Sequence, residues 1–324
     1  MELRHLEVIA AVAEHGSFTA AADALNTVQS NISSHVSRLE RELGVTLVNR
    51  TTGRLTPEGD AVLARTYRIM SEVDSLVSDL GALKAEVSGV VRAGMIGTTA
   101  RWLVPHLLAE CSELHPKLRL VVAEGTTTTL DPLLATGRLD LGVVTLPVPG
   151  RDLTSEALFR EDLVLVVARD QDPVTGMERV GLTDLGRMDL LLPAPGTAFR
   201  SELDAAAKPA GVRLRPRAEL DGVRLIASLT FEGYGPAILP ATAVPQHLRD
   251  RFRLVPIDGL SPRLVGLVLR NRGMPSASTL AVIDLLRKLV ARSEELPEGI
   301  HPADPPAVAP RLEGATRRLG VPNG

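Results

Sequence analysis

Cysteine is almost absent from this chain, which has one, Cys111, among 324 residues. A single cysteine excludes a disulfide within the chain and a metal cluster built on cysteine pairs. Cys111 lies at helical spacing from Leu107 and Leu114, so we expect it to be a small residue of a hydrophobic core. The seven histidines are scattered, and without partners at ligand spacing they predict neither a metal site nor a metal cofactor.

Long apolar runs are also missing. No stretch of about eighteen apolar residues occurs, so no transmembrane helix and no membrane association are expected. The N-terminal stretch 1–18 carries acidic residues inside its apolar part, unlike a signal peptide. Both features predict a cytoplasmic protein. The nucleophile elbow, the P-loop and the glycine-rich dinucleotide fingerprint are absent too, which argues against an enzyme and against a nucleotide cofactor.

An excess of positive charge, the usual signature of nucleic-acid binding, is not present. The formal net charge is −3, and residues 1–60 hold five arginines against eight acidic residues. Because neutralisation of phosphates supplies much of the affinity for DNA, one copy of this segment would bind DNA weakly. Any binding to DNA would depend on a few well-placed cations, doubled by self-association.

What the N-terminal segment does contain is a run of short helices. Apolar spacing predicts helices over 3–15, 18–25 and 28–43, the second preceded by Ser17 as a cap and the third ended by Gly44. Two β-prone pieces, 46–49 and 54–56, flank a hairpin tip at 51–53. This order of elements is that of a helix-turn-helix followed by a wing, and we assign it to residues 1–58.

The third helix has one apolar face and one polar face. A helix that enters the major groove needs small polar residues for close approach, and amide or guanidinium groups for bases and phosphates. A merely solvated face is the alternative, but such faces are usually built from Glu and Lys rather than serines. The predicted contacts to double-stranded DNA are Gln29, Ser30, Asn31, Ser33, Ser34, Ser37, Arg38 and Arg41 on the helix, with Arg50 and Arg54 beside the wing tip.

A long helix follows from Thr56-Pro57, and we assign residues 59–89 to it. Its apolar positions alternate at spacings of four and three, a heptad pattern typical of self-associating helices. The alternative is a long helix packed only on its own chain. The residues predicted to form a dimer interface are Val62, Ile69, Val73, Leu76, Leu80 and Leu83.

Residues 90–295 alternate between apolar strand-like runs and helical stretches, which indicates an α/β fold with parallel sheets. About 200 residues of this pattern suggest two lobes. We assign lobe I to about 90–162 and 269–295, and lobe II to about 163–268. The remaining residues, 296–324, are rich in Pro and Gly and are predicted to be a disordered tail.

Residues 16–59 resemble the winged helix-turn-helix of LysR-type transcriptional regulators. One departure is Val48, where the family usually has Phe, a change that affects packing under the wing. The resemblance extends over nearly all of 1–295 and implies a dimerising linker helix, assembly to a dimer or tetramer, and an effector domain of two lobes similar to periplasmic binding proteins. The matching features are Ser17-Phe18, Ala21-Ala22, Leu25, Gln29-Ser30, Ser33, Leu39-Glu40, Leu43-Gly44, Leu47, Arg50, Leu55-Thr56 and Gly59.

In this family the effector lies between the lobes. At the matching positions, turns that lead from strands into helices carry hydroxyls and free N–H groups, which suit a carboxylate or phosphate. Threonines there also act as simple helix caps, and the two roles are compatible. Several of the chain's few aromatic residues fall at the same turns, so we expect a small organic anion with an apolar body. The predicted effector contacts are Thr98, Thr99, Arg101, Trp102, Thr126, Thr128, Thr145, Pro147, Thr197, Phe199, Arg200 and Tyr234.

A rival interpretation is a solute-binding or transport protein, which two lobes would also fit. The segment 16–59 argues against it, because a transport protein has no use for a helix-turn-helix. The sequence predicts an effector that shifts the DNA-bound assembly between two arrangements. It leaves open the identity of the effector, the operator, the choice between activation and repression, and that between dimer and tetramer.

Overall fold

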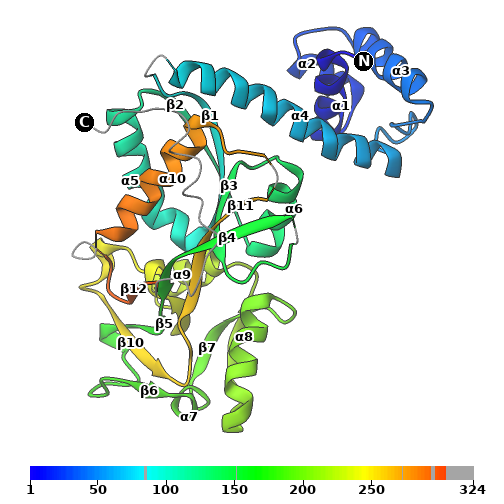
Figure 1. Ribbon diagram of the computed structural model, residues 1–324. Coiled ribbons are helices and arrows are strands. Elements are labelled where there is room, and N and C mark those ends of the chain that lie inside the picture. Colours follow the sequence, from blue (N-terminus) through cyan, green and yellow to red (C-terminus); the bar gives the residue numbers. More distant parts are fainter. Residues whose placement is uncertain (84–85, 151, 272, 293–295, 304–324) are drawn as a thin grey trace.

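The computed structural model describes residues 1–83, 86–150, 152–271, 273–292 and 296–303. The N-terminal helices stand apart from the rest of the chain and are joined to it by one long helix (Figure 1). Two six-stranded sheets form the two lobes that follow. This arrangement confirms the predicted order of winged helix-turn-helix, linker helix and two-lobed α/β domain.

The DNA-binding domain contains three helices, α1 (Leu3–His15), α2 (Phe18–Ala24) and α3 (Gln29–Leu43). The Ser17 hydroxyl accepts a hydrogen bond from the N–H of Ala20 and so caps α2. Gly44 ends α3 with φ of 73°, a left-handed conformation that glycine adopts without strain. The wing closes through a single bridge between Val48 and Leu55.

The linker helix α4 spans Pro57–Ala82, with the Thr56 hydroxyl accepting from the N–H of Gly59 at its start. The sequence predicted a helix to residue 89, and this boundary is wrong. Strand β1 begins at Ser88 and pairs with β2 from its first residue. The backbone hydrogen bonds of 88 and 89 therefore go to the sheet, which a local heptad pattern does not reveal.

Lobe I is built on a sheet of strand order β12-β4-β11-β3-β1-β2. Helices α5 and α10 pack against each other, and α6 packs on β1, β3 and β11. Its core contains Phe159, Leu103, Leu141 and Leu286, all fully buried. The elements of lobe I are β1 (Ser88–Ile96), α5 (Gly97–Leu114), β2 (Lys117–Gly125), α6 (Thr127–Thr136), β3 (Leu141–Thr145), β4 (Leu153–Glu161), β11 (Arg263–Arg270), α10 (Ala277–Ala291) and β12 (Ile300–Pro302).

Lobe II has the strand order β6-β10-β5-β9-β7-β8. Its two faces carry separate hydrophobic clusters, one around Leu165 and Leu203 and one around Val166 and Ile226. The elements of lobe II are β5 (Leu163–Ala168), β6 (Val180–Gly181), α7 (Leu182–Leu185), β7 (Asp189–Pro193), α8 (Ala198–Ala207), β8 (Arg215–Leu220), α9 (Val223–Phe231), β9 (Ala237–Pro240) and β10 (Phe252–Asp258), with a short 3₁₀ turn η3 (Ala241–Ala243).

The predicted boundary between the lobes at 268/269 is wrong, because β11 belongs entirely to lobe I. It pairs antiparallel with both β3 and β4. Both sheets are therefore mixed and not purely parallel. The strands at which the chain passes between the lobes, β4, β5, β10 and β11, each pair antiparallel with a neighbouring strand. An apolar run such as Leu264–Leu269 looks the same in either lobe, so its partner strands alone decide its place.

The prediction of a disordered tail from residue 296 is also wrong at its start. Residues 300–302 form β12, which pairs with the outer edge of β4, and Ile300 is buried. The side chain of His301 lies 2.8 Å from Asp162. Backbone pairing stabilises this segment despite its weak hydrophobic pattern. The rest of the predicted tail, 304–324, lies outside the described residues.

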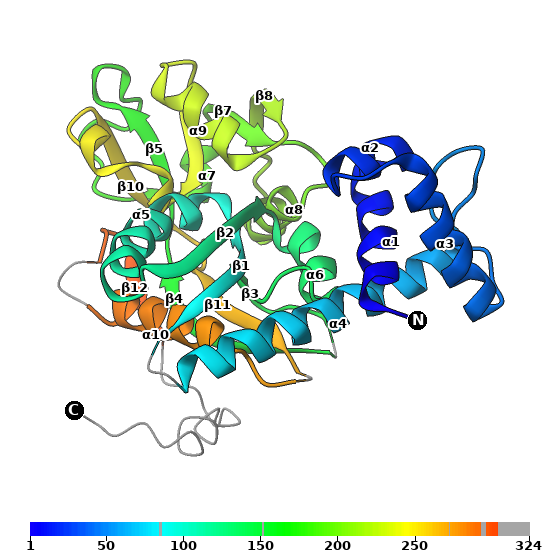
Figure 2. The same ribbon diagram turned by 90° about the horizontal axis from the view of Figure 1, so that it is seen from above.

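The linker helix runs along lobe I for much of its length (Figure 2). The N–H of Ser278 donates to Ser78 at 3.1 Å, and the N–H of Ala277 to Asp79 at 2.9 Å. Nearer the DNA-binding domain, Arg68 donates to the carbonyl of Ala135 at 2.8 Å. These bonds fix the direction of α4 relative to lobe I.

Candidate DNA-binding surface and effector pocket

The outer face of α3 presents side chains that are free to contact another molecule. Gln29, Ser30, Ser34, Arg38 and Arg41 are all exposed, and none makes a side-chain hydrogen bond within the described part of the chain. The apolar face of the same helix, with Ile32, Val36 and Leu39, is fully buried in the domain core. The helix is therefore anchored by one face and leaves the polar face open. Asn31 differs from these residues, because its amide donates to Thr27 at 2.9 Å.

Arg50, at the base of the wing, is held against α3. Its guanidinium donates to Ser33 at 3.3 Å, to Ser37 at 3.1 Å and to Glu40 at 2.7 Å. The same group lies 5.0 Å from the centre of the Phe18 ring. Ser33 and Ser37, predicted as DNA contacts, thus also orient Arg50. The other wing arginine, Arg54, is exposed and has no side-chain partner among the described residues.

Glu40 fastens the wing to α3. Its carboxylate accepts from the N–H groups of Leu47 and Val48, at 2.9 and 3.2 Å, and from Arg50. Burial alone would raise the pKa of Glu40, but these hydrogen bonds outweigh it and hold that pKa below its usual value. The wing is therefore fixed by a charged group that belongs to the family resemblance but to which the sequence assigned no role.

The predicted seam of α4 divides into two parts. Val62 packs on the core of the DNA-binding domain. Further along, Ile69 and Val73 are 38% exposed, while Leu76 is 60%, Leu80 55% and Leu83 71% exposed. Exposed leucines in a row on one helix face are rarely left in water, so this part of the seam fits a partner helix.

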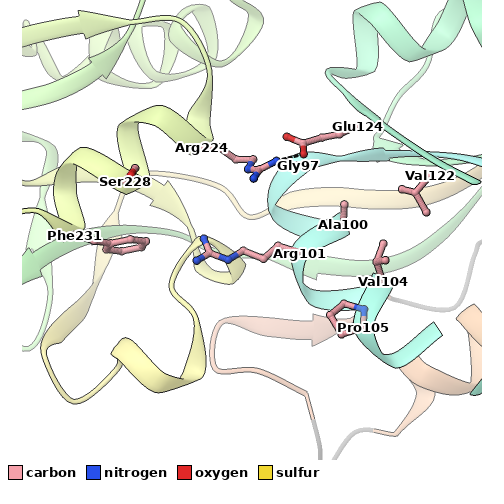
Figure 3. A pocket seen from close by; sticks show the side chains of 10 residues that line it. All are labelled: Gly97, Ala100, Arg101, Val104, Pro105, Val122, Glu124, Arg224, Ser228 and Phe231. Atoms are coloured by element: carbon pink, nitrogen blue, oxygen red, sulfur yellow. Dashed lines mark hydrogen bonds and ion pairs between the residues drawn. The ribbon is translucent and has the colours of Figure 1, made fainter. Parts of the chain in front are cut away.

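A pocket of about 560 Å³ lies between the lobes, where α5 and β2 of lobe I face α9 of lobe II (Figure 3). One wall is apolar and includes Val104, Pro105 and Val122. Of the predicted effector contacts, Arg101 alone lines it. The residues that line it are Gly97, Ala100, Arg101, Val104, Pro105, Val122, Glu124, Arg224, Ser228 and Phe231.

Arg101 reaches from α5 across to lobe II. Its guanidinium donates to the carbonyl of Ala243 at 3.3 Å and lies 5.9 Å from the centre of the Phe231 ring. Burial lowers the pKa of Arg101, and the nearby charge of Arg224 lowers it further. Arg224 itself forms an ion pair with Glu124 of β2. The pocket thus holds two guanidinium groups, one of them already paired.

Three other predicted effector contacts, Trp102, Phe199 and Arg200, interact within their own lobes. Trp102 packs edge-on against Phe159 at 5.3 Å in lobe I, and Phe199 packs on the core of lobe II. Arg200 donates to Asp204 at 3.0 Å and to Glu219 at 2.8 Å, so it is occupied within lobe II.

The predicted threonines have varied environments. The hydroxyls of Thr126 and Thr197 cap α6 and α8. Thr99 is fully buried, with no partner for its hydroxyl in the described structure. The N–H of Thr145 donates to Thr127 at 3.2 Å. Thr128 is exposed. None of these five threonines lines the pocket.

The last two predicted contacts, Pro147 and Tyr234, lie elsewhere. Pro147 follows a cis peptide bond after β3. Tyr234 is 55% exposed in the turn after α9. Neither belongs to the lining of the pocket.

Thr98 leads to a charged cluster that the sequence did not reveal. Its hydroxyl accepts from Arg263 at 2.8 Å. Arg263 pairs with the fully buried Glu161, at 2.7 Å from Nε, and Glu161 also accepts from the N–H and hydroxyl of Thr242 in lobe II. The cluster therefore ties the two lobes together where the chain crosses between them. Its hydrogen-bonded pairs are 81, 102 and 165 residues apart in the chain, so no local pattern could have found the cluster.

Cys111 is buried in the hydrophobic core of lobe I, as expected from its spacing. Burial raises the pKa of its thiol, and Glu110 raises it further. Within the described residues, no group of three or more His, Cys, Asp or Glu side chains could hold a metal ion. Nor does any described helix combine the length and apolar character needed to cross a membrane.

A winged helix-turn-helix joined by a long helix to two α/β lobes is the architecture of a DNA-binding regulator. Residues 3–60 match the model of the bacterial regulatory helix-turn-helix proteins of the lysR family, and residues 84–291 match that of the LysR substrate binding domain. The chain belongs to the LysR family of transcriptional regulators and is not an enzyme.

Among similar proteins is a probable hydrogen peroxide-inducible genes activator from Streptomyces viridosporus. It is 33% identical over 292 residues, covering 88% of this chain and 93% of its own. A protein of the same description from Mycobacterium avium is 31% identical, covering 90% and 95%. The DNA-binding transcriptional dual regulator OxyR of Escherichia coli (strain K12) is 29% identical over 274 residues, which cover 83% of this chain and 90% of OxyR.

Solved structures show the same fold. A full-length cysteine-to-aspartate variant of OxyR from Pseudomonas aeruginosa superposes with a TM-score of 0.70 at 23% identity, covering 94% of this chain and 99% of that one. Full-length CbnR in complex with its target DNA superposes with a TM-score of 0.65 at 25% identity, covering 90% of this chain and 100% of CbnR. The helix-turn-helix, linker helix and two lobes of this chain are thus those of full-length LysR-type regulators.

Proposed function

We propose that this regulator binds its operator through the open face of α3, as a dimer or tetramer in the cytoplasm, and responds to a small organic anion in the pocket between α5 and α9. The observation that carries the proposal is Arg101, a guanidinium without a carboxylate partner among the described residues, beside an apolar wall in a pocket of about 560 Å³. Pockets of this size suit a small ligand.

The charge and shape of the pocket favour an anion with an apolar body. Burial and the repulsion by Arg224 both act against the positive charge of Arg101. A carboxylate placed beside that guanidinium would offset both effects, with paired hydrogen bonds that a neutral ligand does not form as strongly. The apolar part of the ligand would then cover Val104, Pro105 and Val122.

The names of the relatives suggest hydrogen peroxide as an alternative signal. Sensing by a disulfide within the chain needs two cysteines, and this chain has one. A thiol reacts with oxidants as the thiolate, and the raised pKa and burial of Cys111 disfavour that form. These features support a ligand rather than a thiol switch in this chain.

The mechanism we propose is a population shift. The pocket is shared by both lobes, so a bound ligand favours the lobe arrangement that it contacts best. Because α4 is hydrogen-bonded to lobe I, a change in how the lobes pack in the assembly would alter the spacing of the DNA-binding domains. A ligand with equal affinity for both arrangements would have no effect.

Calorimetry with benzoate and benzamide tests the ligand class, since the two compounds differ mainly in charge. We expect benzoate to bind, benzamide to bind much more weakly, and Arg101→Gln to abolish the preference. Arg119→Gln, which removes an exposed arginine of β2 outside the pocket lining, is the matched control. Binding of neutral ligands alone would reject the proposal.

A second experiment separates a ligand from peroxide. In footprinting on the DNA upstream of the gene, benzoate should change the protected region, and hydrogen peroxide should not. Cys111→Ala should behave like the unchanged protein in both cases. A peroxide response that Cys111→Ala removes would instead support a thiol signal.

A further inference from the structure

The pocket between the lobes contains three charged side chains, and they are not equivalent. Glu124 at the end of β2 and Arg224 near the start of α9 form an ion pair across the lobes (Figure 3). Arg101 has no such partner within the described structure, and its hydrogen bond goes to the neutral carbonyl of Ala243. Two guanidinium groups and one carboxylate leave a net charge of one positive unit in the lining.

The ion pair sits closely against the first residue of α5. A Cβ added at Gly97 would lie 2.5 Å from a carboxylate oxygen of Glu124 and 3.1 Å from Cδ of Arg224. Any side chain at position 97 would therefore displace the pair. Because Gly97 is the first residue of α5, the Glu124 carboxylate lies near the start of this helix, where a negative charge is favoured. The residue before α5, Ile96, has no side chain that could cap the helix.

The ion pair with Arg224 holds the Glu124 carboxylate in the lining of the pocket. A ligand with one carboxylate neutralises the remaining charge of Arg101. A second carboxylate would find Arg224 already paired and would face Glu124 directly, and like charges at close range are unfavourable.

We propose that Glu124 determines the specificity of the pocket by restricting it to ligands with a single negative charge. The proposal rests on the proposed function, because it concerns the same pocket. It assigns to Glu124 the rejection of dicarboxylates and to Arg224 the neutralisation of Glu124. Arg224 thus supports anion binding through Glu124 and not through contact with the ligand.

Calorimetry with benzoate and phthalate, which differ by one carboxylate, tests this assignment. The unchanged protein should prefer benzoate. Glu124→Gln should raise the affinity for phthalate more than that for benzoate, shifting their ratio by about fivefold, the size expected for a partly exposed charge pair. Glu113→Gln, with the same change of charge on an exposed part of α5 outside the pocket lining, should leave the ratio unchanged.

Arg224 provides the sharper test, because its replacement leaves Glu124 unpaired in the lining of the pocket. Arg224→Gln should lower the affinity for benzoate by about fivefold, and the double variant Glu124→Gln/Arg224→Gln should restore it. A residue that contacted the ligand directly would not be rescued in this way. Melting curves for each variant establish that it is folded.

Different results overturn different claims. If benzoate binds but Glu124→Gln leaves the preference for benzoate unchanged, or if the double variant is not restored, the role of Glu124 is wrong while the proposed function stands. If neither carboxylate binds to the unchanged protein or to Glu124→Gln, the anion-binding function itself fails and the specificity inference falls with it.

Discussion

The hydroxyl of Tyr67 in the linker helix donates a hydrogen bond to the carboxylate of Glu14 in α1, over 3.1 Å. The guanidinium of Arg138, just after α6, lies 5.0 Å from the centre of the same tyrosine ring. One side chain of α4 therefore contacts both the DNA-binding domain and lobe I. Besides the backbone of α4, this side chain therefore joins the two functional parts of the regulator.

We predict that Tyr67→Phe lowers stability near neutral pH by about 1 kcal/mol, through the loss of this hydrogen bond. Burial, and then the charge of Glu14, raise the pKa of Tyr67 to about 12, from an ordinary value of 10.0. The folded state therefore favours the neutral phenol, and the stability this provides is present below pH 10 and lost between pH 10 and 12. Urea unfolding at pH 8 and pH 11 should show a smaller alkaline loss for the phenylalanine variant. Equal losses would contradict the prediction.

Leu76→Asp should prevent dimerisation without unfolding the chain. Leu76 is 60% exposed on α4, so the charge costs little in one copy but would be buried unpaired in a helix pair. Light scattering after size exclusion should show a smaller particle, and DNA affinity should fall with it. Met177→Asp, a comparable change at a 44% exposed residue of lobe II, is the control. A dimer that survives Leu76→Asp would mean that the seam of α4 does not hold it.

Gln29→Ala should weaken operator binding, whereas Arg50→Ala should lower the melting temperature. Gln29 is exposed and unpaired among the described residues, so its loss should weaken binding to the operator by about 1–3 kcal/mol with an unchanged melting temperature. The guanidinium of Arg50 donates hydrogen bonds to Ser33 and Glu40 of α3, so its loss should lower the melting temperature. Fluorescence anisotropy on operator and unrelated DNA, with melting curves for both variants, measures this. An unchanged operator preference in Gln29→Ala would exclude a base contact there.

Glu161→Gln should be among the most destabilising changes in the effector domain. Glu161 is fully buried and its partner Arg263 is 10% exposed, so removing the carboxylate leaves a buried cation, at a cost of about 3 kcal/mol. Urea unfolding would measure this loss. The isolated surface pair of Arg179 and Asp258 offers a comparison, since Asp258→Asn should have little effect. Similar losses for both variants would contradict the assigned role of the buried pair.

Local patterns were sufficient to predict the helices of the DNA-binding domain. The helices of 1–58 begin at hydroxyl caps or end at glycine, and their apolar spacing follows a single buried face. Such signals act over a few residues, so they can be recognised in the sequence. The end of α4 and the place of β11 depend on which strands they meet, and no local pattern carries that information.

The effector site was predicted less well for the same reason. The family resemblance pointed to turns at strand ends, and of the residues there Arg101 lines the pocket. Glu124 and Arg224 are one hundred positions apart in the chain and form their pair only because β2 and α9 meet in the fold. Val104 and Pro105 look in the sequence like ordinary residues of a helix, although they form the apolar wall.

The small strand β12 has a consequence for solubility. Strand β4 is nine residues long, and its outer edge would present unpaired N–H and C=O groups if β12 were absent. Exposed edges of this kind readily pair with strands of other molecules and start aggregation. Residues 300–302 occupy part of that edge. They therefore protect a regulator that assembles as an oligomer on DNA from aggregating through its β-sheets.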